Sequence, residues 1–505
     1  MRLTMLLDMA ADGFGDRVVV GRRDDGITAA QMQARAAAGA ALVRESGADA
    51  IVYMAMNGPA FPVAMFAAAR AGVPLVPINY RLGTEQLASL LGKHPQAFGI
   101  ADGLAADALA RSGISSISTT EWLAATADGA ERGVDVEESF DDDVEAPALV
   151  IYTSGTTSEP KGVLLRHDNL VSYVLGSVEF MGASDQDAAL VSVPPYHIAA
   201  VANVISNLYA GRRTMVLEQF APEQWLDIVR AEQVTNALVV PTMLSRIVEC
   251  DADKSVPSLR GLAYGGAPMP ASLIEKALGA WPEVGFVNAY GLTETSSTVA
   301  VLGPDDHRAA LASDDPRIRA RLSSVGKVLP GIDLEIRGFD DTVLPVGVTG
   351  RICVRGDQVS AEYAGIGRAV DERGFFDTRD KGYVDEEGYL FIGGRVDDTI
   401  IRGGENIAPA EIEEVILRHP AVVDVAVVGV PDEEWGQRIE AAIVVRAGFT
   451  VDENDLHEFV KASLRSSKTP SRFFFWPELP RTETGKLVRR NVLAKVLEAE
   501  EAVAG

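Results

Sequence analysis

The chain has 505 residues, of which 47% are apolar and 23% are charged, and its formal net charge is −26. This length exceeds what one ordinary hydrophobic core can organise and predicts two or more globular domains. The acidic balance argues against a nucleic-acid-binding surface and against docking on anionic lipid, because both need clustered Lys and Arg.

The cysteines and the N-terminal stretch bear on the cellular compartment. Only Cys250 and Cys353 occur, so the sequence predicts no disulfide framework and fits a reducing environment. The first residues, MRLTMLLDMAADGFGD, have an acidic break at Asp8 and do not resemble a signal peptide. The most apolar stretch, residues 60–78, is interrupted by Arg70 and by prolines and falls short of a membrane span. We therefore expect a cytoplasmic protein without stable membrane insertion.

Through the first part of the chain, short apolar runs alternate with longer helical patterns. The runs have the length and composition of buried strands, and they are residues 50–56, 73–78, 146–153, 188–195, 236–241 and 286–291. Helical patterns such as residues 58–72 and 271–281 lie between them. This alternation predicts an α/β fold, with parallel sheets flanked by helices in a large N-terminal domain.

The pattern changes twice in the second part of the chain. From about Ser324, short runs broken by glycine predict a small β-rich subdomain. Beyond Arg395 an α+β pattern begins, with helices expected at residues 409–420 and 453–467 and strands at 422–431 and 438–446. We place the domain boundary at residues 395–398, which gives an N-terminal domain of residues 1–395 and a C-terminal domain of residues 396–505.

Residues 152–162 read YTSGTTSEPKG and follow an apolar run. Hydroxyls and the free N–H groups of a glycine-rich turn donate hydrogen bonds to phosphate oxygens, and Lys161 adds a point charge. The spacing is not that of a Walker loop. Taken alone, the stretch fits a phosphate-binding loop and an ordinary Ser/Thr turn equally well.

Four further stretches decide between these interpretations. They are YGGAPMP (264–270), NAYGLTET (288–295), FFDTRDKGYVDEEGYLFIGGRVDDTIIRGGENI (375–407) and PRTETGKLVRR (480–490). With the first stretch they resemble, in order, the signature blocks of the adenylate-forming superfamily, from about residue 50 to 490. That family contains acyl-CoA and aryl-CoA synthetases, luciferases and the adenylation domains of peptide synthetases.

The resemblance implies an AMP-forming acyl-CoA synthetase that uses ATP, Mg²⁺ and CoA. Such an enzyme joins a carboxylate to the α-phosphate of ATP, releases pyrophosphate, and passes the acyl group from the acyl-adenylate to the CoA thiol. The first step brings two anions together, so cations and hydrogen-bond donors must offset their repulsion.

The matching positions acquire expected roles from this resemblance. The β- and γ-phosphates would lie against Thr153, Ser154, Gly155, Thr156, Thr157 and Lys161. Thr293 would bond the α-phosphate, and Glu294 would hold Mg²⁺, since a carboxylate beside a triphosphate needs a hard cation between them. The nucleoside would be bound by Gly265, Gly266, Ala267, Asn288, Ala289, Tyr290 and Gly291, with Asp380 on the ribose hydroxyls and Arg395 beside it.

The C-terminal blocks imply two alternative arrangements of the C-terminal domain. Lys486 would bridge the substrate carboxylate and the phosphate during adenylation. Rotation about a hinge at Asp397 would then withdraw Lys486 and bring in Gly403 and Gly404, which leave room for pantetheine. Lys468 would meet the CoA phosphates.

The block PPYHIAAV (194–201) matches the part of the family that positions the acid. It offers Tyr196 and His197 and no carboxylate for an α-ammonium, so we expect an acid without an α-amine. His197 would gate or orient the carboxylate, and Gly291 would line the acyl site. The mostly small or apolar surroundings favour a hydrophobic or aromatic acid, with aryl, medium-chain and polycyclic acids left open.

No carrier domain follows Lys486, whose position is about 20 residues from the end of the sequence, so a freestanding enzyme that loads CoA is expected. The sequence leaves the oligomeric state open, a homodimer included.

Three departures from the family pattern motivate competing hypotheses. Ala200 stands in the acid block where glycine is frequent and would narrow the acid pocket slightly. Ser158 stands in the phosphate loop, and Arg379 stands beside Asp380, each where the family usually has glycine. An enzyme specialised for the thioesterification step, acting on a supplied acyl-adenylate, is one alternative. A non-catalytic acyl-nucleotide-binding protein is another, and it is disfavoured because Lys161, Glu294 and Lys486 are all present.

Overall fold

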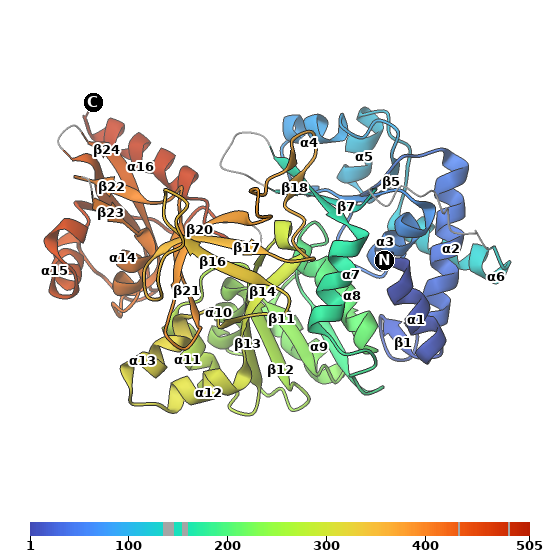
Figure 1. Ribbon diagram of the computed structural model, residues 1–505, viewed down its shortest axis with the longest axis horizontal. Helices are drawn as coiled ribbons and strands as arrows, with labels where there is room; N and C mark the ends of the chain where they lie inside the picture. The colour runs from blue at the N-terminus through green and yellow to red at the C-terminus, as the bar shows by residue number, and fades with distance from the viewer. Residues whose placement is uncertain (135–145, 154–159, 404, 433–434, 483–484, 505) are drawn as a thin grey trace.

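The computed structural model describes residues 1–134, 146–153, 160–403, 405–432, 435–482 and 485–504 (Figure 1). Ser154, Gly155, Thr156, Thr157, Ser158 and Gly404, which the sequence singles out, lie outside the described residues. Among the described residues no helix is long and apolar enough to cross a membrane.

The helices of the described residues are α1 Thr4–Phe14, α2 Ala29–Ser46, α3 Ala60–Ala71, α4 Thr84–Leu91, α5 Leu104–Arg111, α6 Thr119–Glu131, α7 His167–Ser177, α8 Ile198–Ala210, α9 Pro222–Ala231, α10 Pro241–Glu249, α11 Ala271–Ala280, α12 Pro304–Ala312, α13 Pro316–Arg319, α14 Pro409–Ile416, α15 Glu453–Ser463 and α16 Arg489–Ala504. Short 3₁₀ helices are η1 Thr293–Thr295, η2 Ala320–Ser323 and η3 Ser466–Lys468.

The first large sheet has eight strands in the order β19-β18-β8-β7-β4-β3-β5-β6. Their bounds are β3 Ile51–Met54, β4 Leu75–Pro77, β5 Phe98–Ala101, β6 Ser116–Ile117, β7 Pro147–Thr153, β8 Lys161–Arg166, β18 Glu362–Tyr363 and β19 Gly367–Arg368. The strands from β7 to β6 run parallel, whereas β7 pairs antiparallel with β8.

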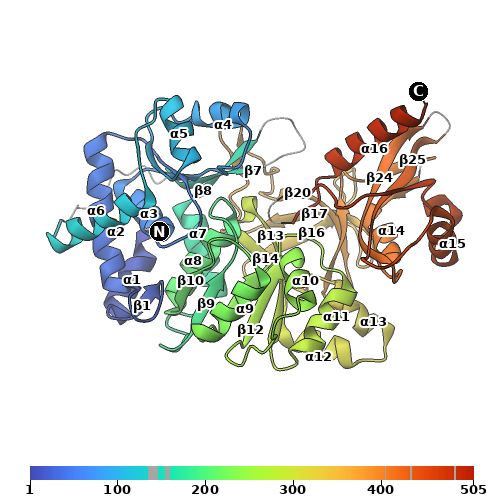
Figure 2. The ribbon, with the colours of Figure 1, turned by 180° about the vertical axis from the view of Figure 1, so that it is seen from behind.

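The second large sheet has nine strands in the order β15-β14-β13-β12-β11-β9-β10-β1-β2. Their bounds are β1 Val18–Val20, β2 Ile27–Thr28, β9 Ala188–Val191, β10 Arg213–Val216, β11 Asn236–Val239, β12 Gly261–Gly265, β13 Gly285–Leu292, β14 Ser297–Leu302 and β15 Lys327–Val328. Figure 2 shows α9, α10 and α11 beside this sheet.

The predicted α/β fold with helix-flanked sheets is confirmed, and all six predicted strands occur, as β3, β4, β7, β9, β11 and β13. The sheets are not parallel throughout. Both edges of the nine-stranded sheet and the β8 side of the eight-stranded sheet are antiparallel, because β8 folds back on β7, β14 on β13 and β2 on β1, whereas β6 at the other edge pairs parallel with β5. A buried parallel strand reads as an unbroken apolar run, which is why the central strands were recognisable and the edges were not.

A single hydrophobic core joins the two large sheets. Its buried side chains come from both sheets and from α1, α2, α3 and α8. The helix α3 consists largely of alanine, and small side chains allow it to be buried all round between the sheets. A hydrogen bond also joins the segment after β3 of the first sheet to the segment after β9 of the second, since Asn57 Nδ2 donates to the Val193 carbonyl oxygen over 2.9 Å. The two sheets therefore form one body.

Local signals set the limits of the longest helix, α2. The Thr28 hydroxyl accepts from the Gln31 N–H while the Gln31 side chain accepts from the Thr28 N–H, which is a capping box. Gly47 ends the helix with φ of 69°, a left-handed conformation that glycine adopts without strain.

The predicted β-rich subdomain is a four-stranded sheet, β16-β17-β20-β21. Its strands are β16 Asp333–Arg337, β17 Gly350–Arg355, β20 Phe376–Val384 and β21 Leu390–Arg395. One part of this region differs from expectation, because β18 leaves it to pair with β8 of the eight-stranded sheet, Tyr363 opposite Val163. That pairing places Tyr363 of this region beside β8, the strand that begins at Lys161.

Residues after Arg395 form a separate set of elements. They comprise a hairpin of β22 Ile400–Arg402 and β23 Glu405–Ile407, and a sheet of β24 Val422–Asp432, β25 Gly436–Val445 and β26 Arg472–Phe475. The helices α14 and α16 pack on this sheet, and α15 packs on α14 (Figure 1). Two hydrophobic clusters are made entirely of residues from Ile400 onward, so this region closes a core of its own.

Candidate active site

The phosphate-loop prediction falls at the tip of the β7–β8 hairpin. Thr153 lies opposite Lys161 in the antiparallel register, so the two ends of the loop are held together by the hairpin. Lys161 is exposed, and its ammonium lies 5.7 Å from the centre of the Tyr363 ring. This geometry presents the Lys161 charge and the Thr153 hydroxyl at one edge of the eight-stranded sheet.

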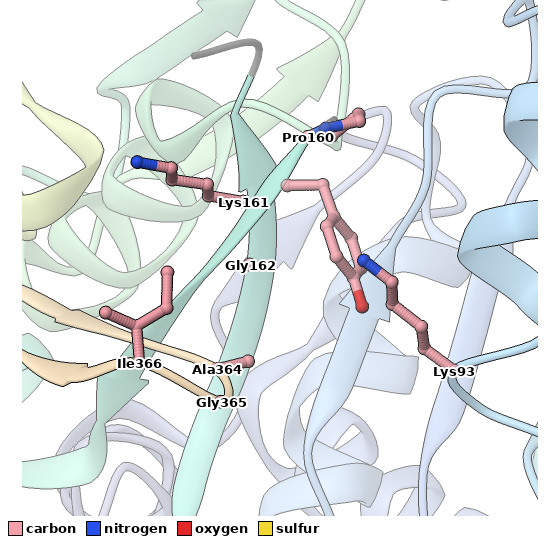
Figure 3. Close-up of a pocket in the computed structure, with 8 residues that line it drawn as sticks. Lys93, Pro160, Lys161, Gly162, Ala364, Gly365 and Ile366 are labelled. Carbon is pink, nitrogen blue, oxygen red and sulfur yellow. The ribbon is translucent and has the colours of Figure 1, made fainter. Parts of the chain in front are cut away.

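A hollow of about 510 Å³ lies beside this hairpin (Figure 3). It is lined by Lys93, Tyr152, Pro160, Lys161, Gly162, Ala364, Gly365 and Ile366. In Figure 3 the Lys161 side chain points away from Lys93. The Lys93 ammonium lies 5.6 Å from the Tyr152 ring, whose hydroxyl is 2.8 Å from His94 Nε2. Burial raises the pKa of Tyr152 to about 12, so its phenol stays neutral.

The predicted magnesium ligand, Glu294, lies in η1 directly after β13, next to Thr293. The Tyr363 hydroxyl donates to Glu294 Oε1 over 2.8 Å, and the Ala361 N–H donates to the Glu294 carbonyl oxygen over 3.0 Å. Burial and the nearby carboxylate raise the pKa of Tyr363, which keeps it a hydrogen-bond donor. Tyr363 therefore links the Glu294 carboxylate to Lys161.

Three residues predicted to bind the nucleoside lie together in the structure, namely Tyr290, Asp380 and Arg395. The Tyr290 hydroxyl donates to Asp380 Oδ2 over 2.7 Å, and Arg395 Nε lies 3.5 Å from Asp380 Oδ1. Asp380 and Arg395 are also paired across β20 and β21. Burial raises the pKa of Asp380, although Arg395 and Tyr290 oppose the shift. Asn288 has its amide nitrogen engaged, since Nδ2 donates to the Ser324 carbonyl oxygen over 3.0 Å.

Two glycines on neighbouring strands are required by close backbone approach. A Cβ at Gly265 would lie 2.3 Å from the Ala289 carbonyl oxygen, and one at Gly291 would lie 1.8 Å from the Ser297 carbonyl oxygen. Both contacts are with backbone that cannot move aside, so only glycine fits. Gly266 follows with φ of 79°, which turns the chain towards Ala267.

The acid block places Tyr196 and His197 immediately before α8. Their ring centres are 5.0 Å apart, and the Tyr80 ring meets Tyr196 edge-on with 6.2 Å between centres. Burial lowers the pKa of His197 to about 4, and the positive charge of Lys486 adds to the effect. His197 is therefore a neutral imidazole at physiological pH.

Lys486 lies in a C-terminal loop whose form is set by hydrogen bonds. Its N–H donates to the Thr482 hydroxyl over 3.0 Å, and Arg481 Nη1 donates to the Gly485 carbonyl oxygen over 2.6 Å. Gly485 has φ of 76°, and a Cβ there would lie 2.3 Å from Thr242 Oγ1 on α10. The loop is therefore docked against the nine-stranded sheet's helices.

The charges around Lys486 belong to the predicted site. Desolvation and the Arg395 guanidinium lower the pKa of Lys486, whereas Asp380, Asp398 and Glu294 raise it. Its ammonium in turn acts on His197. The structure thus places Lys486 within electrostatic range of His197, Asp380 and Glu294, which the sequence predicts to act on the acid, the ribose and magnesium respectively.

The predicted CoA residues lie elsewhere. Gly403 has φ of 57°, and a Cβ there would meet the Trp435 ring at 3.0 Å. The Lys468 ammonium donates to both carboxylate oxygens of Glu411 over 2.7 Å. These contacts are with other residues of the C-terminal region, and β22 lies far from β7 in Figure 1. Among the described residues, Lys486 therefore lies near residues predicted for adenylation, whereas Gly403 and Lys468, predicted for CoA, contact other residues of the C-terminal region.

Asp397, the predicted hinge residue, lies in the linker of residues 396–399 between β21 and β22 and accepts from Arg379 Nη2 over 2.9 Å. Arg379 has φ of 63°, in the left-handed region that glycine adopts most readily. Its side chain is thus directed to the linker and does not pair with Asp380. Sequence reasoning missed this contact and also the roles of Tyr363 and Tyr80, because each depends on strand register or on a contact between distant segments.

Comparisons with known proteins agree with this arrangement. Residues 7–364 match the model of the AMP-binding enzyme family, and residues 411–486 match that of the AMP-binding enzyme C-terminal domain. The chain belongs to the AMP-binding enzyme family. Residues 7–364 carry the hairpin, Glu294 and Tyr290, whereas Lys486 is the last residue of the C-terminal match.

Curated relatives within this family cover most of the chain. It is 32% identical to the fatty acid–[acyl-carrier-protein] ligase ScoC of Streptomyces coeruleorubidus, over 88% of this chain and 86% of the relative. It is 35% identical to 2-succinylbenzoate–CoA ligase of Bacillus cytotoxicus, over 72% of this chain and 73% of the relative.

Solved structures of the family superpose over nearly the whole chain. The o-succinylbenzoate CoA synthetase MenE of Bacillus subtilis, in complex with the acyl-adenylate OSB-AMP, is 28% identical with a TM-score of 0.83, covering 96% of this chain and 97% of that one. ATP-bound MatB from Rhodopseudomonas palustris is 26% identical with a TM-score of 0.85, covering 98% and 99%. The two-part architecture of this AMP-binding enzyme is therefore that of proteins solved with ATP or an acyl-adenylate.

Proposed function

We propose that this protein is an AMP-forming acid–thiol ligase that activates a hydrophobic or aromatic carboxylic acid as its acyl-adenylate and transfers the acyl group to CoA. The observation that carries the proposal is the position of Lys486. Its charge acts on His197 of the acid block and is itself influenced by Asp380 and Glu294. A lysine so placed lies between the carboxylate donor and the nucleotide, where an acyl phosphate bond would form.

In the first half-reaction the acid carboxylate attacks the α-phosphate of ATP, and pyrophosphate leaves. Lys486 offsets the repulsion between the two anions, and Thr293 donates to the α-phosphate. Lys161 and the Thr153 hydroxyl bind the departing phosphates. The Asp380 carboxylate accepts the ribose hydroxyls, and its contacts with Tyr290 and Arg395 hold it in position. His197, being neutral, presents an imidazole to the acid without competing with Lys486 for its charge.

The donor set suits a magnesium ion held jointly by protein and substrate. Among the described residues no group of three His, Cys, Asp or Glu side chains could hold a metal alone. Mg²⁺ in nucleotide sites is typically bound through one or two carboxylates together with substrate phosphates. Glu294, oriented by the Tyr363 hydroxyl, fits that pattern. When bound, the ion neutralises charge on the phosphates.

In the second half-reaction the CoA thiol attacks the acyl carbonyl, and AMP leaves. We propose that residues 396–505 rotate against residues 1–395 about Asp397, which withdraws Lys486 and brings Gly403 and Gly404 to the acyl site. Lys468 would then meet the CoA phosphates once it parts from Glu411. The separate core of the C-terminal elements supports a rigid-body motion of this kind.

The acid specificity is inferred from the aromatic residues around the acid block. The rings of Tyr80 and Tyr196 meet edge-on beside His197, and α8 begins there with Ile198 and Ala199. One similar relative is named as a fatty acid ligase, and another is named as a ligase of 2-succinylbenzoate, an aromatic acid. Apolar and aromatic walls bind such acids by burying their surface. The thioesterification-only alternative is not favoured, since Arg379 pairs with Asp397 and not with Asp380. The non-catalytic alternative is not favoured, since similar relatives are named as ligases.

The test measures the two half-reactions separately with a panel of aromatic and fatty acids. Acid-dependent ATP–pyrophosphate exchange reports adenylation, and thioester formation from synthetic acyl-adenylates reports transfer. Lys486→Ala should lower the rate of exchange by about two to three orders of magnitude, which is the usual effect of removing one group that stabilises developing charge. It should spare transfer. Lys495→Ala, which removes an exposed lysine of α16, is the matched control and should alter neither.

The thiol acceptor is assigned in the same experiment by comparing CoA with a holo-acyl-carrier protein, because one similar relative is a carrier-protein ligase. Absence of both half-reactions with every acid would refute the proposal. A cytoplasmic location and a homodimer stay predictions, to be checked by cell fractionation and by sedimentation.

A further inference from the structure

We propose that Arg379 is a positioning residue, whose ion pair with Asp397 holds the linker in the adenylation arrangement and so limits the rate of the second half-reaction. The inference rests on the proposed function, since it concerns the conformational change between the two steps. It arises from a side chain that the family pattern usually lacks.

Two contacts attach the linker to β20 at this point. Arg379 Nη2 donates to Asp397 Oδ1 over 2.9 Å, and the Val396 N–H donates to the Arg379 carbonyl oxygen over 2.8 Å. A glycine in place of Arg379 would keep the backbone contact and lose the ion pair. The side chain of Arg379 therefore adds a restraint that the backbone alone does not supply.

The backbone of Arg379 is held in the conformation that aims its side chain. Its φ of 63° costs about 1 kcal/mol or more for a residue with a Cβ. The Arg379 N–H donates to Asp377 Oδ1 over 2.8 Å, and Asp377 is itself paired with Arg351 over 2.6 Å. A strained arginine at a position where glycine is easier indicates that the side chain has a use.

Neighbouring linker residues are attached to different parts of the molecule. Asp397 is paired with Arg379 of β20, whereas Asp398 lies 3.3 Å from Arg489, whose guanidinium also pairs with Glu413 of α14. Asp398 can therefore move with the C-terminal elements while Asp397 cannot move without breaking its pair. The Lys381 ammonium, which donates to the Thr399 hydroxyl over 3.0 Å, adds a third contact from β20 to the linker.

The size of the effect follows from the exposure of the pair. The Arg379 and Asp397 side chains are 56% and 27% exposed. Exposed ion pairs contribute at most about 1 kcal/mol, which corresponds to a change of about two- to fivefold in a conformational equilibrium. The arrangement is thus a modest restraint that shifts the balance between the two conformations without fixing either.

The experiment compares wild type with Arg379→Gly, which removes the pair and relieves the positive φ. Thioester formation from a supplied acyl-adenylate at saturating CoA should rise about two- to fivefold. Pyrophosphate exchange should stay equal or fall. Arg379→Lys keeps a cation and should restore part of the restraint. Asp397→Asn should act like Arg379→Gly, and the double variant should show no further increase, because both remove one interaction.

Salt provides a readout that a merely structural role would not give. At about 1 M NaCl the pair is screened, so the transfer rates of wild type and Arg379→Gly should converge. The matched control is Arg373→Gly, which removes the ion pair of an equally exposed arginine with Glu335 in the same sheet. It should leave both half-reactions unchanged.

The outcomes separate the inference from the proposed function. If wild type performs neither half-reaction, the proposed function fails. If wild type performs both and Arg379→Gly leaves transfer unchanged, or lowers both half-reactions together, the restraint is refuted. A rise in the KM for ATP alone would also refute the restraint. It would indicate that Arg379 acts on the phosphates instead, since the Arg379 charge reaches Tyr363, where it opposes the rise in the pKa of the hydroxyl.

Discussion

The imidazole of His197 lies at the start of α8 in surroundings that oppose its protonation. Burial lowers its pKa from 6.5 to about 4, with Lys486 as the second cause. The protein has six histidines, so a sample labelled at the histidine Cε1 positions gives few resonances. A pH titration followed by NMR should show one resonance with a midpoint near 4, and His197→Asn should remove it.

The same shift has a consequence for stability. Between pH 4 and 6.5 the unfolded chain binds a proton at this residue that the folded protein does not bind. The free energy of unfolding therefore falls by about 1.4 kcal/mol for each pH unit below 6.5, or about 2 kcal/mol by pH 5. In urea unfolding, His197→Asn should lack this part of the pH dependence.

Two controls make the result decisive. His457→Asn removes an exposed imidazole of α15 and should leave the titration midpoint of His197 as it is in wild type. Lys486→Met should raise the titration midpoint of His197, because one of its two causes is removed. A midpoint at or above 6 in wild type, or no change with Lys486→Met, would refute the placement of Lys486 beside the acid block.

Three further predictions concern single contacts of the site. Asp380→Asn should raise the KM for ATP by about ten- to a hundredfold in pyrophosphate exchange, because charged hydrogen bonds to the ribose are lost. Tyr363→Phe should raise the Mg²⁺ concentration needed for half-maximal exchange about tenfold, since Glu294 loses its orienting partner. Gly485→Val should lower exchange at least tenfold and spare transfer, because the new Cβ would clash with Thr242 only while the Lys486 loop is docked.

Each of these predictions has a matched control. Asp305→Asn changes an exposed carboxylate, Tyr383→Phe changes a tyrosine stacked on Phe391, and Gly448→Val changes a glycine with φ of 83° and open space around it. An equal loss of exchange in a control and its partner would show that the site contact is not the cause. Loss of transfer in Gly485→Val would contradict the docking of that loop during adenylation alone.

The central strands could be predicted because burial on both faces leaves an unbroken apolar run. The runs at residues 50–56 and 236–241 became β3 and β11 for that reason. Pairing between distant segments could not be predicted, because a strand's own pattern does not name its partner. The contact of β18 with β8 joins Tyr363 to Val163, two hundred positions apart, and no local signal indicates it.

The site shows the same division. Roles for Lys161, Glu294 and Lys486 could be predicted because each lies in a block that resembles a signature of the adenylate-forming superfamily. The hydrogen bond from Tyr363 to Glu294 follows from the β18–β8 pairing, so it appears only in the structure. For Arg379 the sequence indicated a departure from the family without its consequence. Its partner was settled by the β20–β21 register, which places Val396 and Asp397 beside it.

The closed core of the C-terminal elements changes how the first half-reaction is described kinetically. A unit that stabilises itself gains little fold stability from the rest of the chain, so the linker serves mainly to keep Lys486 close to the nucleotide. Short connections of this kind give effective concentrations of about a millimolar or more. Lys486 therefore reaches the nucleotide by an intramolecular encounter. Lengthening the linker would lower the effective concentration of Lys486 at the nucleotide.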